Sequence, residues 1–413
     1  MNLPLIRALR ERPIALLWAG LATSAIGDQL FAVVLGWVGT GLFGGNAGYL
    51  GALQGTVVLS VALLSGPFAD RLAPRRAMIT ADLVRAAMLV VVVVLWQRAG
   101  QPSATMLVAA IAVLGAAYAF FRPALQASLP SLASSTAALP AVNALLDTTE
   151  RIARLLGPGL IGLLASWIPL VHFLTLDAAS FLASSAAVIG TMRYRKVPHL
   201  APPRMPLKSE LGHGFRAMLR IPVFRKLLFT AGLINGVWYG VYFVAIPLLL
   251  RHDKAPLSAY ATVISAYGAA NLAATLLIGS RPLSARPAAM IFGGNIVLGG
   301  FMALIGFAGM LPVAMHAWLI PLLAACSSIG GPMQDITFAT MRQIVLDRHE
   351  LAAAVRAYMV MNNLGMLVIL MLAPLAFATM GVPWAIAGAS LLLAFVATLM
   401  LWRSRPWLIS YPA

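Results

Sequence analysis

The chain has 413 residues, of which 61% are hydrophobic and only 10% are charged. Soluble domains carry about 25% charged residues, so this composition excludes a soluble domain and predicts a polytopic membrane protein. The apolar runs are long and continuous, which favours membrane-spanning helices over a β-barrel. The net charge of +17 could suggest a nucleic-acid partner, but its distribution follows a membrane rule, so no nucleic acid is expected.

Gaps between charged residues, together with turn residues, predict twelve spanning helices. The expected spans are residues 14–42, 47–69, 77–97, 104–126, 138–165, 169–191, 224–250, 257–279, 287–309, 314–338, 355–378 and 383–403. The predicted fold class is therefore an all-α polytopic membrane protein with two six-helix halves.

Lysine and arginine fall mostly on one side of these spans. If the N-terminus is cytoplasmic, most of the 29 basic residues lie on the inner side, and Arg85 and Arg122 are counted among them. Cytoplasmic loops carry an excess of lysine and arginine. We therefore expect a multi-pass protein of the inner (plasma) membrane, with both termini cytoplasmic and no cleaved signal peptide.

The longest polar stretch, from Arg193 to Pro222, divides the chain. It predicts an N-terminal six-helix bundle over residues 1–192, a cytoplasmic linker over 193–222 with an amphipathic segment, and a C-terminal bundle over 223–413. The segment Phe121–Ala124 and the residues after it have a weak echo from Gly331 onward. Two similar halves indicate a transporter whose binding site lies at the pseudo-symmetric interface.

Motifs for enzyme chemistry are absent from the sequence. There is no phosphate-binding loop of the G-x-x-x-x-G-K-S/T form, no metal-ligand spacing and no nucleophile–base pair. Cys326 is the single cysteine and is interpreted as a packing residue. We therefore expect no catalytic residue, cofactor or metal, and an ion gradient as the energy source.

The stretch G-P-F-A-D-R-L-A-P-R-R, from Gly66 to Arg76, connects the second and third predicted spans. It resembles the signature loop of the major facilitator superfamily, with two departures at its centre, Ala73 and Pro74. The resemblance implies alternating access and a gating role for this loop, with its aspartate close to residues 352–356 at the start of the eleventh helix. The matching residues are Gly66, Asp70, Arg71, Arg75 and Arg76, the last two displaced by one position.

Further stretches resemble exporters within this superfamily. Residues Gly157–Gly162 are similar to an export motif of the family, except that this chain lacks one of its glycines. The similarity implies a kink of the fifth helix at Gly157 and Pro158. Three short segments are similar to the enterobactin-exporter and macrolide-efflux subgroup, namely residues 24–28, 121–124 and 176–181.

Several charged residues fall inside predicted spans, where an isolated charge costs about 2.5–3.5 kcal/mol and usually faces the protein interior. The fifth span carries charges at i, i+3, i+4 and i+7, on one helical face. Mutual neutralisation would let this helix pack in the bundle, and a polar cavity wall that receives an anionic group is the functional alternative. The proton-coupling candidates are Asp28, Glu150 and Asp147, and the cavity candidates of this half are Arg151, Arg154 and Asn143. For Asp177 a structural role is an equal alternative.

The second half carries aromatic and amide side chains on shared helical faces. They predict an amphipathic pocket for a large, partly aromatic substrate, and the alternative is packing plus an interfacial aromatic belt, which would account for Tyr260. The substrate-cavity candidates are Asn235, Trp238, Tyr242, Tyr267, Asn271 and Asn362.

These features together predict a secondary active transporter rather than an enzyme. We expect a monomer in the lipid bilayer that exports an amphipathic small molecule, either a siderophore or a drug-like compound, in exchange for protons. A lipid or lysophospholipid flippase of the same fold is the first alternative. A non-transporting membrane sensor or scaffold is the second, although a scaffold has no need for buried charges.

Overall fold

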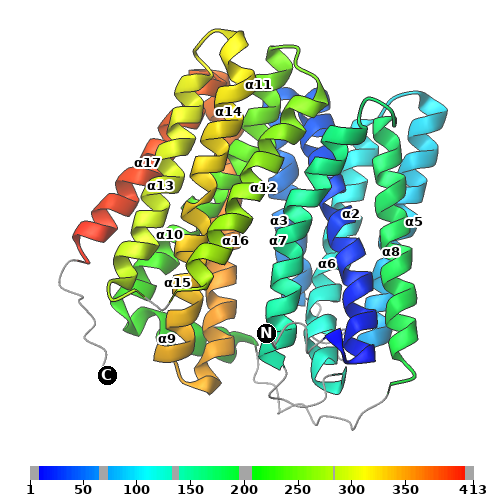
Figure 1. The fold of residues 1–413 in the computed structure, drawn as a ribbon, viewed down its shortest axis with the longest axis vertical. Coiled ribbons are helices and arrows are strands. Elements are labelled where there is room, and N and C mark those ends of the chain that lie inside the picture. Colours follow the sequence, from blue (N-terminus) through cyan, green and yellow to red (C-terminus); the bar gives the residue numbers. More distant parts are fainter. Residues whose placement is uncertain (1–8, 65–72, 133–138, 195–206, 282–283, 405–413) are drawn as a thin grey trace. The chain divides into compact units, whose positions relative to one another are not determined.

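A computed structural model of the protein describes residues 9–64, 73–132, 139–194, 207–281 and 284–404. The regular elements within these ranges are all helices (Figure 1). The first half contains α2 (Arg12–Phe43), the 3₁₀ turn η1 (Gly44–Ala47), α3 (Gly48–Leu64), α5 (Pro74–Ala99), α6 (Ala104–Leu132), α7 (Leu139–Leu164) and α8 (Leu170–Thr191). The second half contains α9 (Leu207–Arg220), α10 (Pro222–Gly240), the π-helical turn η3 (Val241–Ala245), α11 (Ile246–His252), α12 (Leu257–Gly279), α13 (Pro287–Ala308), α14 (Val313–Ser328), α15 (Gly330–Val345), α16 (Arg348–Met380) and α17 (Val382–Trp402).

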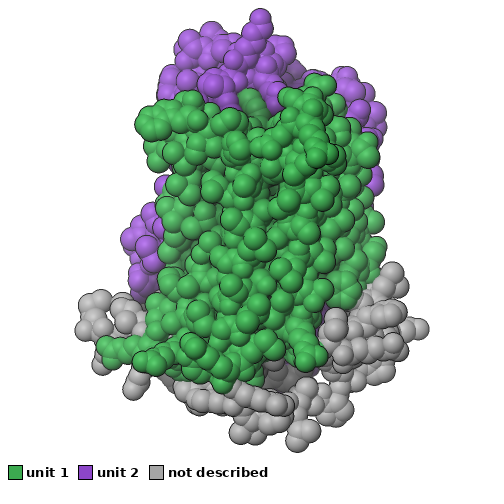
Figure 2. Space-filling model, turned by 90° about the vertical axis from the view of Figure 1, so that its right-hand side faces the viewer, with its two compact units in different colours: residues 1–43, 53–204 green, residues 44–52, 205–413 purple. Residues whose placement is uncertain are grey.

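The chain forms two compact units, coloured separately in Figure 2. Unit 1 comprises residues 1–43 and 53–204, and unit 2 comprises residues 44–52 and 205–413. The η1 turn and the start of α3 thus group with unit 2. The residue-level boundaries expected from the sequence, at 192 and 223, remain predictions.

Ten helical segments of the described residues are long and apolar enough to cross a membrane. The first of them, Arg12–Val61, is 50 residues long, so it corresponds to two of the predicted spans. Helix α7 is not among the ten, and its 26 residues include the four charged side chains of the predicted stripe. With α7 included, the predicted all-α, twelve-helix fold class is confirmed.

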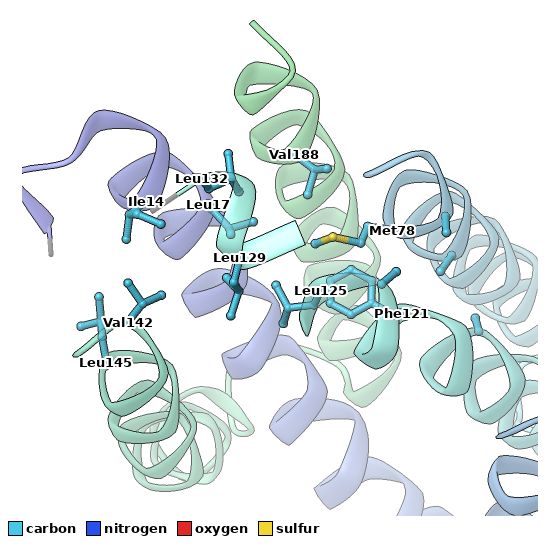
Figure 3. Packing of buried hydrophobic residues seen from close by; sticks show 14 residues of the cluster. Ile14, Leu17, Met78, Phe121, Leu125, Leu129, Leu132, Val142, Leu145 and Val188 are labelled. Carbon is cyan, nitrogen blue, oxygen red and sulfur yellow. The ribbon is translucent and has the colours of Figure 1, made fainter. Parts of the chain in front are cut away.

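Five helices of unit 1 share one apolar cluster, shown in Figure 3. Met78 of α5 and Leu129 of α6 lie at its centre with almost no exposed surface, and α7 adds Val142. Lipid is as apolar as these side chains, so close packing rather than water exclusion holds spanning helices together. The cluster therefore fixes α2, α5, α6, α7 and α8 relative to one another, and all five carry ionisable groups of the candidate site.

Unit 2 brings two helix backbones into direct contact. Gly232 of α10 lies against Gly365 of α16, and a Cβ added at Gly232 would overlap the Gly365 backbone. Small residues at such crossings let spanning helices approach closely. Because the obstacle is backbone rather than a flexible side chain, no rotamer change can relieve the overlap.

Polar contacts reinforce the two ends of unit 2. The amphipathic segment expected in the linker is helix α9, which packs against α16 and joins it through Arg220 and Glu350, 3.0 Å apart. At the turn after α11, the Asp253 carboxylate lies 2.6 Å from Nδ1 of His316 on α14, and both side chains are buried. These contacts hold α9, α14 and α16 in place beside the longer spans.

The glycine contact gives a stability prediction. Gly232→Ala should destabilise the protein by about 1–3 kcal/mol, because the added methyl overpacks the α10–α16 crossing. Gly293→Ala is the matched control: nothing lies within 4 Å of a Cβ at Gly293 in α13, so alanine there should leave stability unchanged or raise it. Thermal unfolding of the purified variants measures both, and equal melting temperatures would contradict the packing described.

Candidate functional site

A buried arginine organises the ionisable residues of unit 1. Arg85 of α5 is only 2% exposed, and its Nη2 donates a short hydrogen bond to Oδ1 of Asp82, one helical turn earlier. The guanidinium carbon lies 4.7 Å from the ring centre of Phe121 on α6 and 4.2 Å from that of Phe181 on α8. Arginine is the cation best suited to such stacking because its charged group is planar and weakly hydrated.

Asp28 of α2 lies at the other side of the same guanidinium. Its Oδ1 is 3.9 Å from Nη1 of Arg85, which is an ion-pair distance but longer than a charge-assisted hydrogen bond. The Asp28 side chain is 42% exposed, whereas that of Asp82 is fully buried. Arg85 therefore separates an accessible carboxyl from an inaccessible one.

A third carboxyl, Asp177 of α8, completes the cluster. It is fully buried, and its Oδ1 accepts a hydrogen bond of 3.2 Å from the Ser180 hydroxyl. A Cβ added at Gly27 of α2 would overlap Asp177 Oδ1, so the glycine before Asp28 lets α2 and α8 approach. Three buried polar atoms of the cluster have no hydrogen-bond partner within the described part of the chain: Oδ2 of Asp82, Oδ2 of Asp177 and Nε of Arg85.

Glu150 of α7, a predicted proton-coupling residue, binds a partner that the sequence spacing did not indicate. Its Oε1 accepts a hydrogen bond of 2.7 Å from Nη1 of Arg122 on α6, and both side chains are partly exposed. Tyr118, one turn before Arg122, has its ring 5.8 Å from the guanidinium carbon. This pair ties α6 to α7 and adds one charge of each sign to unit 1.

The other predicted residues of α7 lie on the same helix but differ in exposure. Arg151 and Arg154 are partly buried, and Asn143 is exposed. Asp147 lies within α7, but its side chain is outside the described residues. The assignment of these four residues to a substrate or proton pathway remains a prediction.

Two residues of the cluster were missed from the sequence. Arg85 was counted with the basic residues of the inner side, and this was wrong: it lies within α5 and is buried, because Asp82, Phe121 and Phe181 replace its hydration shell. Asp82 was not singled out at all. The signal was present, since an acid and a base three residues apart inside a predicted span form a pair on one helical face.

The predicted gating loop is only partly described. Gly66, Asp70 and Arg71 are outside the described residues, and so is any contact of Asp70 with the start of α16. Arg75 donates to the Thr191 carbonyl at 2.9 Å and to the Ser131 hydroxyl at 3.1 Å, whereas Arg76 is exposed. Arg75 therefore links the start of α5 to the ends of α6 and α8.

The predicted kink residues lie inside α7, which continues through Pro158. A Cβ at Gly157 would lie 2.5 Å from Gln29 Cβ and 3.2 Å from the Ile26 carbonyl oxygen on α2. Gly157 thus permits a close approach of α7 to the segment of α2 that carries Asp28. The kink itself remains a prediction.

The predicted cavity residues of unit 2 make hydrogen bonds and ring contacts between helices. The amide of Asn235 on α10 donates to Asn362 Oδ1 on α16 at 2.5 Å, and the indole N–H of Trp238 donates to the Tyr267 hydroxyl on α12 at 3.0 Å. The Tyr242 and Tyr267 rings are 4.7 Å apart, and Asn271 donates to the Ser328 carbonyl at 3.1 Å. Asn235, Trp238 and Asn362 are partly exposed, whereas Tyr242, Tyr267 and Asn271 are buried.

Tyr242 lies in the π-helical turn η3, and such turns occur frequently at functional sites. Its hydroxyl is within hydrogen-bonding distance, 2.5 Å, of the Ser327 hydroxyl on α14. The packing part of the interpretation of Tyr260 agrees with the structure and the belt part does not: the side chain is fully buried and donates to the Tyr242 carbonyl at 3.0 Å. That carbonyl belongs to the π-helical turn, so Tyr260 supports the turn from α12.

Solved structures with a similar fold are helical transporters. A POT family transporter in complex with a thioalcohol-conjugated peptide has a TM-score of 0.72 at 11% identity, with 97% of each chain covered. A bacterial homologue of the iron transporter ferroportin, in an inward-facing state, has a TM-score of 0.69 at 15% identity, with 94% of this chain and 98% of that chain covered. At these identities the likeness shows the fold alone.

The sequence comparisons define the family. Residues 17–370 match the sequence model of the Major Facilitator Superfamily, and the chain belongs to this family. A curated relative, the multidrug efflux pump Tap of Mycolicibacterium fortuitum, is 26% identical over 346 residues, which cover 79% of this chain and 80% of the relative. The resemblance read from the Gly66–Arg76 loop is thereby confirmed at the level of the family.

The Arg85 cluster gives a prediction about stability. Arg85→Gln leaves the fully buried Asp82 without its cation and should destabilise the protein by about 3–5 kcal/mol. The double variant Asp82→Asn/Arg85→Gln should recover most of this loss, because it removes both members of the pair. Thermal unfolding measures both, and a double variant as unstable as the single one would show that Asp82 does not depend on Arg85.

Proposed function

We propose that this protein is a secondary active transporter that exports an amphipathic, drug-like molecule in exchange for protons. The observation that carries the proposal is the partly exposed Asp28 carboxyl beside the buried Arg85 guanidinium. A carboxyl inside a spanning helix is costly, and such groups are typical of proton relays and substrate pathways. The alternating-access cycle is the one expected for the family.

The charge balance of unit 1 supports proton exchange. Asp28 and Asp82 form ion pairs with one guanidinium and Asp177 lies near them, so full ionisation of the three carboxyls would leave two negative charges without a cation of this cluster. A buried charge without a partner is neutralised rather than maintained. Asp28 alone of these three carboxyls is substantially exposed, so we assign it the exchange of protons and, with it, competition between proton and substrate.

The polar aromatic set of unit 2 supports the substrate class. Trp238 and Asn362 are partly exposed, and they offer an indole ring and an amide group. Such surfaces suit a molecule with an extended apolar body and a few hydrogen-bonding groups. The relative named as a multidrug efflux pump supports export of a drug-like compound, and a siderophore remains the narrower form of the same proposal.

The remaining assignments follow from the topology. We place the protein in the inner membrane with both termini in the cytoplasm, because most of the basic residues then lie on the cytoplasmic side. The Gly66–Arg76 loop then acts as a cytoplasmic gate, to which Arg75 contributes by anchoring the start of α5. The transporter works as a monomer in this proposal.

The function is tested in everted membrane vesicles that carry a pH-sensitive dye. Three probes separate the candidate substrates: erythromycin for drug export, iron-free enterobactin for siderophore export and a lysophosphatidylglycerol for lipid transport. Addition of a transported probe should release protons from the acidified vesicles, and Asp28→Asn should abolish this release because the amide exchanges no proton.

Asp335→Asn is the matched control, because Asp335 is an exposed carboxyl in α15 of unit 2 and should leave proton release unchanged. Abundance in the membrane and melting temperature must be similar for both variants. The proposal is wrong if no probe moves protons in the wild type, or if Asp28→Asn and Asp335→Asn release protons equally.

A further inference from the structure

We propose that Asp82 is a positioning residue for proton exchange. Asp82 holds Arg85 while Asp28 carries a proton, and it releases Arg85 to Asp28 when Asp28 is ionised. This inference rests on the proposed role of Asp28 and adds to it a second carboxyl. The evidence is geometric and lies entirely within unit 1.

Two aromatic rings pack against the Arg85 guanidinium. Phe121 and Phe181 cover the guanidinium at 4.7 and 4.2 Å from their ring centres. Aromatic faces attract a cation but offer no hydrogen-bond acceptor that would fix its edge. The rings therefore stabilise the cation without fixing the direction in which its N–H groups point.

Each terminal nitrogen of the guanidinium lies near a different carboxyl. Nη2 is hydrogen-bonded to Asp82, whereas Nη1 is 3.9 Å from Asp28. A shift of about 1 Å would bring Nη1 to charge-assisted hydrogen-bond distance from Asp28. The present arrangement is thus the one in which Arg85 is hydrogen-bonded to Asp82, and its Nε has no hydrogen-bond partner among the described residues.

The exposures of the two carboxyls fit this division of roles. Asp82 is completely buried and cannot exchange protons directly with water, whereas Asp28 is 42% exposed. An ionised Asp28 attracts Arg85, and a protonated Asp28 does so much less. Asp82 prevents the cation from being left unpaired in that second case, which would otherwise be costly.

Other ionisable groups also face Asp28 and must be separated from this effect. Asp177 of α8, Glu150 of α7 and Arg122 of α6 act on it through space, and Tyr118 of α6 lies beside them. None of them is hydrogen-bonded to Arg85 in the described residues. The test therefore compares variants at Asp82 with and without Arg85.

The experiment is an infrared pH titration of the full-length protein in lipid, which detects protonated carboxyl groups and needs no substrate. The band lost in Asp28→Asn is assigned to Asp28. In Asp82→Asn its midpoint should move to lower pH by about one unit, because Arg85 then pairs permanently with Asp28. In Arg85→Gln the midpoint should move to higher pH, and Asp335→Asn should not move it.

A double variant separates the role of Arg85 from direct repulsion between the carboxylates. In Asp82→Asn/Arg85→Gln the midpoint should match that of Arg85→Gln alone. Two differences in the Asp28 midpoint are compared: that between Arg85→Gln and the double variant, and that between the wild type and Asp82→Asn. The inference is overturned if both are downward shifts of equal size. It is also overturned if Asp82→Asn only lowers the melting temperature and leaves the midpoint in place.

Arg85→Lys covers the case in which Asp82→Asn does not fold. Lysine keeps the charge but lacks the planar fork that reaches both carboxyls, so the Asp28 midpoint should rise, and a wild-type midpoint would contradict the inference. If the antiport hypothesis is wrong, the vesicle assay shows no proton release, but the predicted shifts of the Asp28 midpoint are still observed. Failure of the Asp82 role would abolish the shifts and leave antiport intact.

Discussion

The cost of placing a charge inside a membrane is the constraint on which this structure depends. Arg85 lies within a spanning helix and is 2% exposed, so its hydration shell must be replaced by protein. Asp82 supplies a hydrogen bond and two phenylalanine rings supply stacking. The same guanidinium also lies near Asp28, and we propose that its position depends on whether Asp28 carries a proton.

The helix packing of unit 1 holds the residues around Arg85 in place. The shared apolar cluster fixes α2, α5, α6, α7 and α8, while Gly27 lets α2 approach Asp177 on α8. The residues around Arg85 come from α2, α5, α6 and α8, and small relative displacements of these helices would alter its distances. A transporter that changes conformation can use such displacements to change the affinity of a carboxyl for protons.

Unit 2 contributes a different chemistry. Its predicted cavity residues are uncharged amide and aromatic side chains, and the π-helical turn at Tyr242 is supported by Tyr260 and Ser327. Hydrogen bonds to one another and to Ser327 and Ser328 lower the cost of burying these polar groups. Proton exchange is therefore assigned to carboxyls of unit 1, and substrate selection to neutral polar groups of unit 2.

The sequence predicted the fold well, because spans of about 20 apolar residues leave few alternatives in a membrane. The site was predicted less completely. Asp28 and Glu150 were recognised as charges inside spans, but the Arg122 partner of Glu150 comes from another helix, and such pairings depend on helix packing that spacing along the chain does not encode. Arg85 was misplaced because a count of basic residues by side takes no account of whether an arginine is buried. The burial of Tyr260 was missed because an aromatic residue near a span end can face either lipid or protein.

The most direct test of the central claim separates proton coupling from substrate binding. In proteoliposomes, using the probe that moves protons in vesicles, wild-type protein should accumulate the probe under an imposed pH gradient and should also exchange labelled for unlabelled probe without a gradient. Asp28→Asn should retain exchange and lose gradient-driven accumulation, because only the coupled step needs the carboxyl. Accumulation by Asp28→Asn at the wild-type level would contradict the account.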